Sequence, residues 1–221
     1  MSEIITVNMN ELAESIGVPS SLFTPPIPNA KPMVQYNWDG SAVGKAAQQL
    51  RQTYSSPGTQ LAFLGHVDVW IVLALAYGVE DTCTCYFASP NHDENNTFTY
   101  IPLDLLPIGT PSGEVYFDYK IREEGDIVYM DYNVDDPAVQ GHSFFHDSIN
   151  KLILPEIPEG KTLCLYGGGI YPVQWAVTNT YKRFATSVFT AAHEDTVYTC
   201  AWSGDETYQV GDQLPRKRKM I

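Results

Sequence analysis

One layout occurs twice in this chain, first as Leu61-Ala-Phe-Leu-Gly65-His-Val-Asp-Val-Trp-Ile-Val-Leu-Ala74-Leu-Ala-Tyr and again as Leu163-Cys-Leu-Tyr-Gly167-Gly-Gly-Ile-Tyr-Pro-Val-Gln-Trp-Ala176-Val-Thr-Asn. Each copy has a short apolar run, a glycine-containing turn and a second apolar run typical of a buried helix. The two copies start about one hundred residues apart, a period too long for a solenoid repeat. We therefore expect two copies of one small α/β unit.

The flanking sequence extends each copy to the order β-α-β-α-β-β. Strands that alternate with helices predict mainly parallel sheets, with an antiparallel hairpin at the edge. The expected fold class is α/β with two tandem units. We expect an N-terminal helix and a proline-rich segment in residues 1–32, a first unit in 33–110, a second unit in 111–215 and a basic tail in 216–221.

The expected elements follow from apolar periodicity, caps and breakers. A short helix at residues 8–16 should end at Gly17. In the first unit we expect strands at 33–38, 60–64, 82–88 and 97–102, and helices from about 41 to 54 and from 69 to 77, the latter capped by Asp68 and ended by Gly78. In the second unit we expect strands at 114–120, 127–132, 162–166, 184–190 and 196–202, and helices at 143–154 and 172–183.

Composition is that of a folded domain in a reducing compartment. Hydrophobic residues make up 44% of the 221 residues and charged residues 18%, enough for a packed core. No apolar run approaches the roughly 18 residues of a membrane-spanning helix. The N-terminus carries Glu3 and Glu11 but no basic region, so we expect no signal peptide and a cytoplasmic protein.

The four cysteines support the same compartment. They lie in strand-like runs without Cys-x-x-Cys spacing, so we interpret them as buried, reduced thiols rather than metal ligands: Cys83, Cys85, Cys164 and Cys200.

The net charge is −13, and a field of that sign repels a nucleic-acid backbone. The tail Arg216-Lys217-Arg218-Lys219 is the exception, because it holds four of the thirteen basic residues. Two interpretations remain open for this tail. It is either a solvated, frayed terminus or a contact to RNA or an acidic partner.

The glycine turn before the second apolar helix is the sharpest local feature. Gly167, Gly168 and Gly169 let a ligand approach the backbone, and the helix that begins near Tyr171 offers its N-terminal N–H groups. These residues are candidates for binding a phosphodiester. The alternative is a tight turn that needs glycine for its backbone conformation. In the first unit, Gly65 and His66 hold the corresponding place.

Histidine supplies the candidate catalytic groups. His66 and His193 are candidate general bases, each next to a predicted turn. The alternatives are a hydrogen-bonded bystander for His66 and a solvated polar turn for His193. His142 and His146 have helical i, i+4 spacing, which is compatible with a metal, but they lack the glutamate of a zinc-protease motif.

Residues 126–214 resemble the Csx-three family of CRISPR-associated ring nucleases. The resemblance rests on the run Gly167–Ala176, on Ser187-Val-Phe-Thr190, on Val197-Tyr-Thr-Cys-Ala-Trp202 and on the closing Tyr208-Gln-Val-Gly-Asp212. Residues 33–108 match the same layout more faintly. The resemblance implies antiviral defence, binding of cyclic tetra-adenylate between dimers, and its linearisation with help from a divalent cation such as manganese.

This sequence departs from the family at three positions. The family's aspartate falls near Ala191, one histidine falls within Trp202-Ser203-Gly204 and another falls near Lys182. We therefore expect a type III CRISPR-associated accessory protein that binds cyclic oligoadenylate, with weak or no ring-nuclease activity; if it is an enzyme, it is a cyclic oligoadenylate phosphodiesterase. A homodimer is compatible with this hypothesis. The alternative is a non-catalytic subunit of a type III CRISPR effector ribonucleoprotein.

Overall fold

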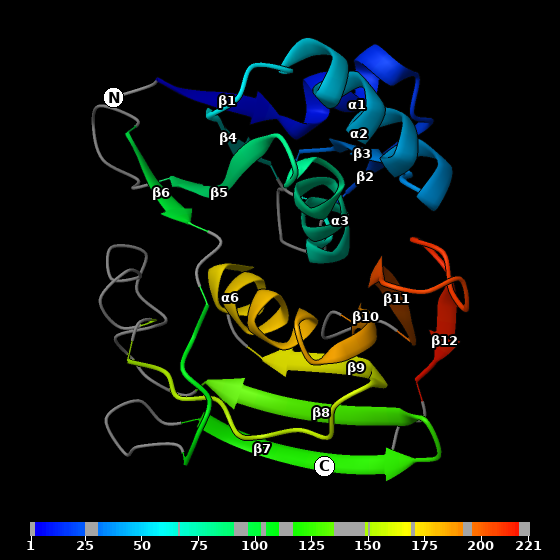
Figure 1. The fold of residues 1–221 in the computed structure, drawn as a ribbon. Helices are drawn as coiled ribbons and strands as arrows, with labels where there is room; N and C mark the ends of the chain where they lie inside the picture. Colours follow the sequence, from blue (N-terminus) through cyan, green and yellow to red (C-terminus); the bar gives the residue numbers. More distant parts are fainter. Residues whose placement is uncertain are drawn as a thin grey trace.

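The computed structural model describes residues 3–24, 31–65, 67–90, 97–102, 105–110, 117–134, 149, 151–168, 171–191 and 196–216. Two β-sheets enclose a pair of helices, α3 (Val69–Val79) and α6 (Tyr171–Lys182) (Figure 1). Helix α3 contacts strands of the second sheet, and α6 contacts a strand of the first. One hydrophobic core therefore runs through both halves of the chain.

The first sheet consists of four strands, of which three are parallel and the last is antiparallel. Its order is β1 (Ile4–Asn8), β4 (Thr59–Leu64), β5 (Cys83–Pro90) and β6 (Phe98–Pro102). Leu61 and Phe63 of β4 are buried, as the apolar run predicts.

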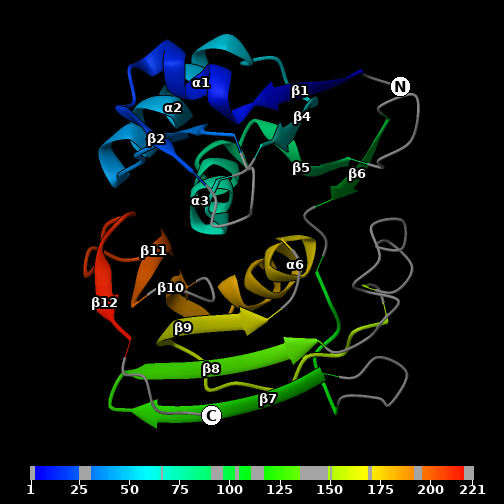
Figure 2. The same cartoon turned by 180° about the vertical axis from the view of Figure 1, so that it is seen from behind.

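The second sheet consists of six strands, visible from both sides in Figures 1 and 2. Its order is β12 (Gln213–Pro215), β11 (Val197–Ser203), β10 (Ala185–Ala191), β9 (Lys161–Gly168), β8 (Ile127–Val134) and β7 (Phe117–Glu124). The described strands form two parallel pairs, around β9, and three antiparallel pairs. The α/β class with mixed sheets is thus confirmed. The expectation of mainly parallel pairing is wrong for this sheet, because a hairpin strand is added at one edge and β12 at the other.

Local signals placed the described helices well. Helix α1 (Met9–Ile16) ends at Gly17, whose φ of 74° is left-handed. Helix α2 (Gly40–Thr53) begins at Asp39, whose carboxylate accepts from the Ala42 N–H at 2.8 Å. The predicted end of α3 at Gly78 is wrong. The helix continues to Val79, so Gly78 lies inside it. Glycine suits this position because a Cβ there would come 2.8 Å from the Cβ of Ala47.

Helices α3 and α6 are buried on nearly all sides because a sheet lies on each side of them. Ten of the eleven α3 residues are buried, which explains its unbroken apolar run. Their last turns meet where Lys182 binds Glu80 and lies 4.2 Å from the Tyr77 ring centroid. Figure 1 shows α3 nearly end-on and α6 from its side, so the two helices cross.

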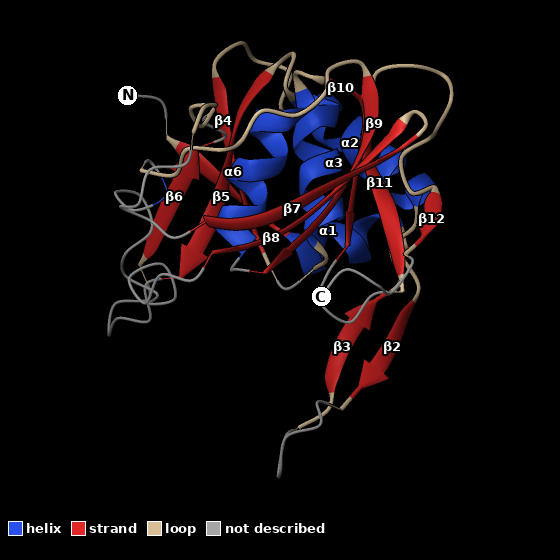
Figure 3. Ribbon diagram, turned by 90° about the horizontal axis from the view of Figure 1, so that it is seen from below, coloured by secondary structure: helices blue, strands red, loops and turns tan. Residues whose placement is uncertain are grey.

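Residues 33–38, predicted as the first strand of the first unit, lie elsewhere. Strand β3 (Met33–Tyr36) pairs only with β2 (Ser20–Phe23), among the described strands, in a two-stranded ribbon that projects from the body (Figure 3). The first position in the sheet belongs to β1. A boundary at residue 32 would therefore separate β1 from the sheet to which it belongs. The sequence of a short strand does not show with which other strand it pairs.

The helix expected at 143–154 lies mainly outside the described residues. Ile149 is described and helical, but the predicted end is wrong, because residues 151–154 are not helical and Leu154 forms a β-bridge with Ile108. The remaining strands and helices of the second half match their predicted positions within a few residues. Leu163 and Leu165 are buried, as their apolar run predicts, and Val177 and Phe189 are buried as well.

Candidate functional site

The predicted site residues divide into those the structure describes and those it does not. His66, His193, Gly169 and Lys217, Arg218 and Lys219 lie outside the described residues, as do His142 and His146. Gly65, Gly167, Gly168 and Arg216 are described, as is the backbone of Tyr171 at the start of α6.

Gly167 and Gly168 belong to strand β9 rather than to a turn. They pair in parallel register with Tyr132 and Asn133 of β8. A Cβ at Gly167 would lie 2.0 Å from Cζ of the buried Tyr132 ring, so packing alone requires glycine there. Gly65 follows the same rule, because a Cβ there would approach the Cβ of Met9 to 2.9 Å. The tight-turn alternative is thus wrong for Gly167, where the Tyr132 ring occupies the space of a side chain, whereas Gly65 does have a positive φ, of 150°.

Arg216 joins the glycine segment to the beginning of the basic tail. Its guanidinium carbon lies 3.3 Å from the centroid of the Tyr166 ring, and Tyr166 immediately precedes Gly167. The Arg216 N–H also donates to the carbonyl of Thr196 at 2.9 Å. Arg216 is thus an ordered cation on the outer face of the second sheet, where arginine stacks on an aromatic ring.

Asp131 is the carboxylate that interacts with Arg216 and with two further basic residues. It is the register partner of Tyr166 on β8. Burial raises the pKa of the Asp131 carboxyl, while the positive charges of Arg216, Arg122 and Lys120 act to lower it. Three cations therefore act on one partly buried carboxylate, in a chain whose net charge is −13.

We call Lys120, Arg122, Asp131, Tyr166 and Arg216 the Arg216 site. Lys120 and Arg122 come from β7, where they face Asp131 and Tyr129 across the ladder. Arg122 also binds Glu124 and lies 4.2 Å from the Tyr129 ring centroid. Asp131 and Tyr166 lie toward the carboxyl ends of parallel strands, the end of an α/β sheet where ligands usually bind. The site combines cations with aromatic faces, a chemistry that suits a nucleotide phosphate.

Sequence reasoning missed Lys120, Arg122 and Asp131. A signal was present, because Asp118, Lys120 and Arg122 alternate along one strand and so share one face. Their meeting with Arg216 had no local signal, since about ninety residues separate β7 from β12.

The first half of the chain presents a different corner. Asn8 caps α1, with its side-chain oxygen 3.0 Å from the Asn10 N–H. Asp68 precedes α3 and makes no side-chain hydrogen bond to the helix N-terminus.

Lys182 and Ser203, which lie at or near the positions where the resemblance would place two histidines, have structural contacts. Lys182 binds Glu80 and lies between the rings of Tyr77 and Trp202, at 4.2 and 5.3 Å from their centroids. Ser203 shares a 2.9 Å hydrogen bond with the hydroxyl of Ser187. These side chains hold the two halves and the β10–β11 ladder together.

The closing motif Tyr208–Asp212 is structural as well. The Gly211 N–H donates to the Cys200 carbonyl, and the Cys200 N–H donates to the Asp212 carbonyl. The Tyr208 ring packs edge-on against Phe189 at 4.9 Å between centroids. The motif thus closes the second sheet.

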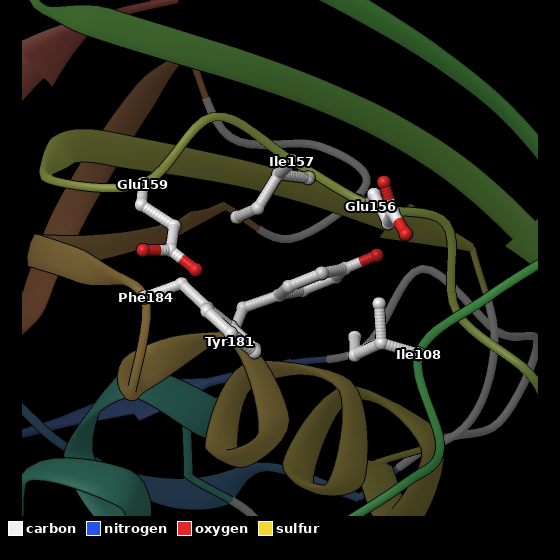
Figure 4. Close-up of a pocket in the computed structure, with 6 residues that line it drawn as sticks. All are labelled: Ile108, Glu156, Ile157, Glu159, Tyr181 and Phe184. Carbon is white, nitrogen blue, oxygen red and sulfur yellow. The ribbon is translucent and has the colours of Figure 1, made fainter.

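A cavity of about 190 Å³ lies beside the C-terminal end of α6. Figure 4 shows Tyr181 in the middle of its lining, with Glu156 and Glu159 on either side. The Tyr181 hydroxyl donates to the carbonyl of Pro155 at 2.8 Å. Two carboxylates repel an anion, so this cavity is a poor phosphate site.

Within the described ranges, no three His, Cys, Asp or Glu residues are arranged to hold a metal ion. No helix among them is long and apolar enough to cross a membrane. Comparison with models of known protein families gives no match, and comparison with curated proteins gives none either.

Proposed function

We propose that this protein binds a cyclic oligoadenylate at the Arg216 site, with weak or no ring-nuclease activity. The observation that carries the proposal is the stacking of Arg216 on Tyr166, directly before the glycines of β9. A guanidinium held on an aromatic ring can pair with a phosphodiester and stack with a base. Lys120 and Arg122 add positive charge at the same place.

We infer further that the chain contains two copies of one unit. Strands β1, β4, β5 and β6 have the same order and relative directions as β8, β9, β10 and β11. In each set a buried helix, α3 or α6, joins the second strand to the third. The first unit then begins at β1, and the β2–β3 ribbon is an insertion. Superposition of the two sets checks this, and a mismatch in connectivity would exclude a duplication.

Isothermal titration calorimetry with cyclic tetra-adenylate tests the binding proposal. The Arg216→Ala variant should lose affinity by about tenfold, equivalent to roughly 1.4 kcal/mol. Arg51→Ala is the matched control. This substitution removes the same charge, but Arg51 lies in the first half of the chain, where it pairs with Asp81 at 3.6 Å. Absence of binding by the wild type at about 100 μM ligand would refute the proposal.

The expected weak activity has its own measurement. General acid–base catalysis contributes about 10²–10⁴-fold to a rate. Lys182 and Ser203 lie at or near the positions where the resemblance would place two histidines, and both make structural contacts instead. Linearisation of cyclic tetra-adenylate under single-turnover conditions should therefore be slow, with or without manganese. If it is rapid, His66→Ala and His193→Ala are the first variants to measure.

The second candidate function is a non-catalytic subunit of a type III CRISPR effector ribonucleoprotein. One observation favours it: four large apolar side chains are exposed on the β2–β3 ribbon. Size-exclusion chromatography separates the two candidates, because a free dimer favours the messenger-binding function and stable association with CRISPR backbone proteins favours the subunit.

A further inference from the structure

Three neighbouring strands of the second sheet place a carboxylate between the basic groups of the Arg216 site (Figure 2). The pairing register aligns Lys120 of β7, Asp131 of β8 and Tyr166 of β9 in one row across the sheet. Side chains of register partners point to the same face. The guanidinium carbon of Arg216 lies 3.3 Å from the Tyr166 ring centroid at one end of this row. Asp131 therefore lies between Lys120 and the stacked pair of Tyr166 and Arg216.

The other groups around Asp131 belong to residue types that keep their charge at acid pH. The charged and titratable side chains that surround it on this face come from β7, β9, β11 and the residue after β12: Lys120, Arg122, Cys164, Tyr166, Tyr198 and Arg216. Burial raises the pKa of the Cys164 thiol to about 12 and raises the pKa of the Tyr198 hydroxyl. Lysine and arginine stay positive, and thiols and phenols stay neutral, in the range where a carboxyl titrates.

A bound anion and the ionised Asp131 compete for the same cations. Burial raises the pKa of the Asp131 carboxyl, whereas the positive charges of Arg216, Arg122 and Lys120 lower it. A phosphodiester held by these cations offsets their effect on the carboxyl. A negative charge nearby also raises the pKa of a carboxyl directly. Anion binding and protonation of Asp131 therefore favour each other, because such a coupling is reciprocal.

We propose that Asp131 regulates the Arg216 site, in that a phosphodiester binds there together with a proton that Asp131 takes up; this regulation rests on the function proposed above. While Asp131 is ionised, its charge repels the phosphodiester and offsets part of the attraction of the three cations. Once Asp131 is protonated, the cations act on the ligand alone. The site holds its ligand more tightly in acid and releases it as pH rises.

The affinity for cyclic tetra-adenylate should fall as pH rises. The fall begins at the raised pKa of Asp131 in the free protein, above the ordinary carboxyl value of about 4, and ends at the still higher pKa of the complex. Isothermal titration calorimetry between about pH 5 and 8 should show a loss of about tenfold, which corresponds to a difference of about one unit between these two pKa values. Titrations in two buffers of different ionisation enthalpy should show proton uptake on binding.

Substitutions in the row separate Asp131 from other sources of pH dependence. Asp131→Asn has a similar size but does not ionise, so it should bind about tenfold more tightly than the wild type at about pH 8 and should lose the pH dependence and the proton uptake. Asp118→Asn, at an exposed position of β7 outside the Arg216 site, should keep both. Lys120→Gln removes a cation that lowers the Asp131 pKa, so the fall in affinity should move to higher pH.

His193 requires a variant of its own, because a histidine that gains a proton also binds an anion more tightly in acid. It lies outside the described residues, between β10 and β11 in the sequence, together with Glu194 and Asp195. His193→Asn should keep the pH dependence, and so should the double variant Glu194→Gln with Asp195→Asn. The basic residues 217–219 also lie outside the described residues, but lysine and arginine do not titrate in this range.

The outcomes separate this regulation from the proposed function. Absence of binding by the wild type at every pH would overturn the proposed function and the regulation with it. Binding without pH dependence, or with proton release, would overturn the regulation alone. A pH dependence that persists in Asp131→Asn would do the same, because it would come from the ligand or from another group. Proton uptake is measured on the wild type, so it decides the proposal even if Asp131→Asn does not fold.

Discussion

Gly40 and Gly211 face each other across the junction of the two halves with no room for a side chain on either. A Cβ on Gly211 would lie 2.7 Å from Cα of Gly40, and a Cβ on Gly40 would lie 1.9 Å from the carbonyl oxygen of Val210. The glycine of the closing motif thus fits against the first turn of α2. The backbones of the two halves meet at this contact.

Alanine at either glycine should loosen this junction. Gly40→Ala should cost about 1–3 kcal/mol, because the Val210 backbone must move. Gly211→Ala should cost at least as much, since its φ of 93° adds strain of about 1–3 kcal/mol. Gly44→Ala in the same helix is the control. Its Cβ meets nothing within 4 Å, and it should gain about 0.5–1 kcal/mol in urea unfolding. Equal effects at Gly40 and Gly44 would contradict the tight contact.

Gly167→Ala should destabilise the protein whether or not a ligand binds. The new Cβ would strike the Tyr132 ring, which is buried in the core and stacks on the Phe117 ring. Overpacking of this kind costs about 1–3 kcal/mol. A double-mutant cycle with Tyr132→Val measures the cause, because the alanine should cost much less once the ring is gone. Additive effects of the two substitutions would show that the glycine has another role.

Phe189→Ala tests the packing of the outer face of the second sheet. Phe189 is fully buried, and its truncation should cost about 3–5 kcal/mol in denaturant unfolding. Tyr208→Ala removes the ring that packs on it but is half-buried, so it should cost less. A loss below about 1 kcal/mol for Phe189→Ala would mean that this face is not a packed core.

The Asp131 carboxyl predicts a pH dependence. Because burial raises its pKa, the folded state holds this proton more tightly than the unfolded state does. Its ionisation therefore lowers stability as pH rises from the ordinary carboxyl range, about 4, through the raised pKa. Asp131→Asn should match the wild type at low pH and gain stability relative to it above that window. Asp118→Asn, at an exposed position on β7, is the control. A relative gain that shrinks with rising pH would contradict the assignment.

The cysteines should resist alkylation in the folded protein. Burial raises the pKa of the Cys85, Cys164 and Cys200 thiols to about 12. The fraction of reactive thiolate at pH 8 is then very small. Iodoacetamide should label the native chain only as fast as it unfolds, and it should label all four cysteines in urea. Mass spectrometry that finds rapid labelling of any of these three would show that its strand is open to solvent.

Local sequence signals determined most of the elements. The Gly17 stop and the apolar runs at Leu61–Leu64 and Leu163–Tyr166 act within a few residues, so the end of α1 and the strands β4 and β9 could be predicted. The same signals predicted the α/β class and the burial of the apolar run that contains Phe63. The sequence also identified Arg216 as a candidate contact residue, because it belongs to a basic run in an acidic chain.

Strand partners and the candidate site were decided by the tertiary structure. Nothing near Ile4–Asn8 signals that β1, rather than β3, pairs with β4, because parallel pairing depends on contacts between residues far apart in the chain. Arg216 meets Asp131 only because β12 and β8 are strands of one sheet whose outer face they share. Gly167 looked like a ligand or turn residue and Gly211 like part of a family motif, yet at each position a distant neighbour, Tyr132 or Gly40, occupies the space of a side chain. Sequence patterns report the preferences of a segment, whereas exclusion of one group by another is set by three-dimensional packing.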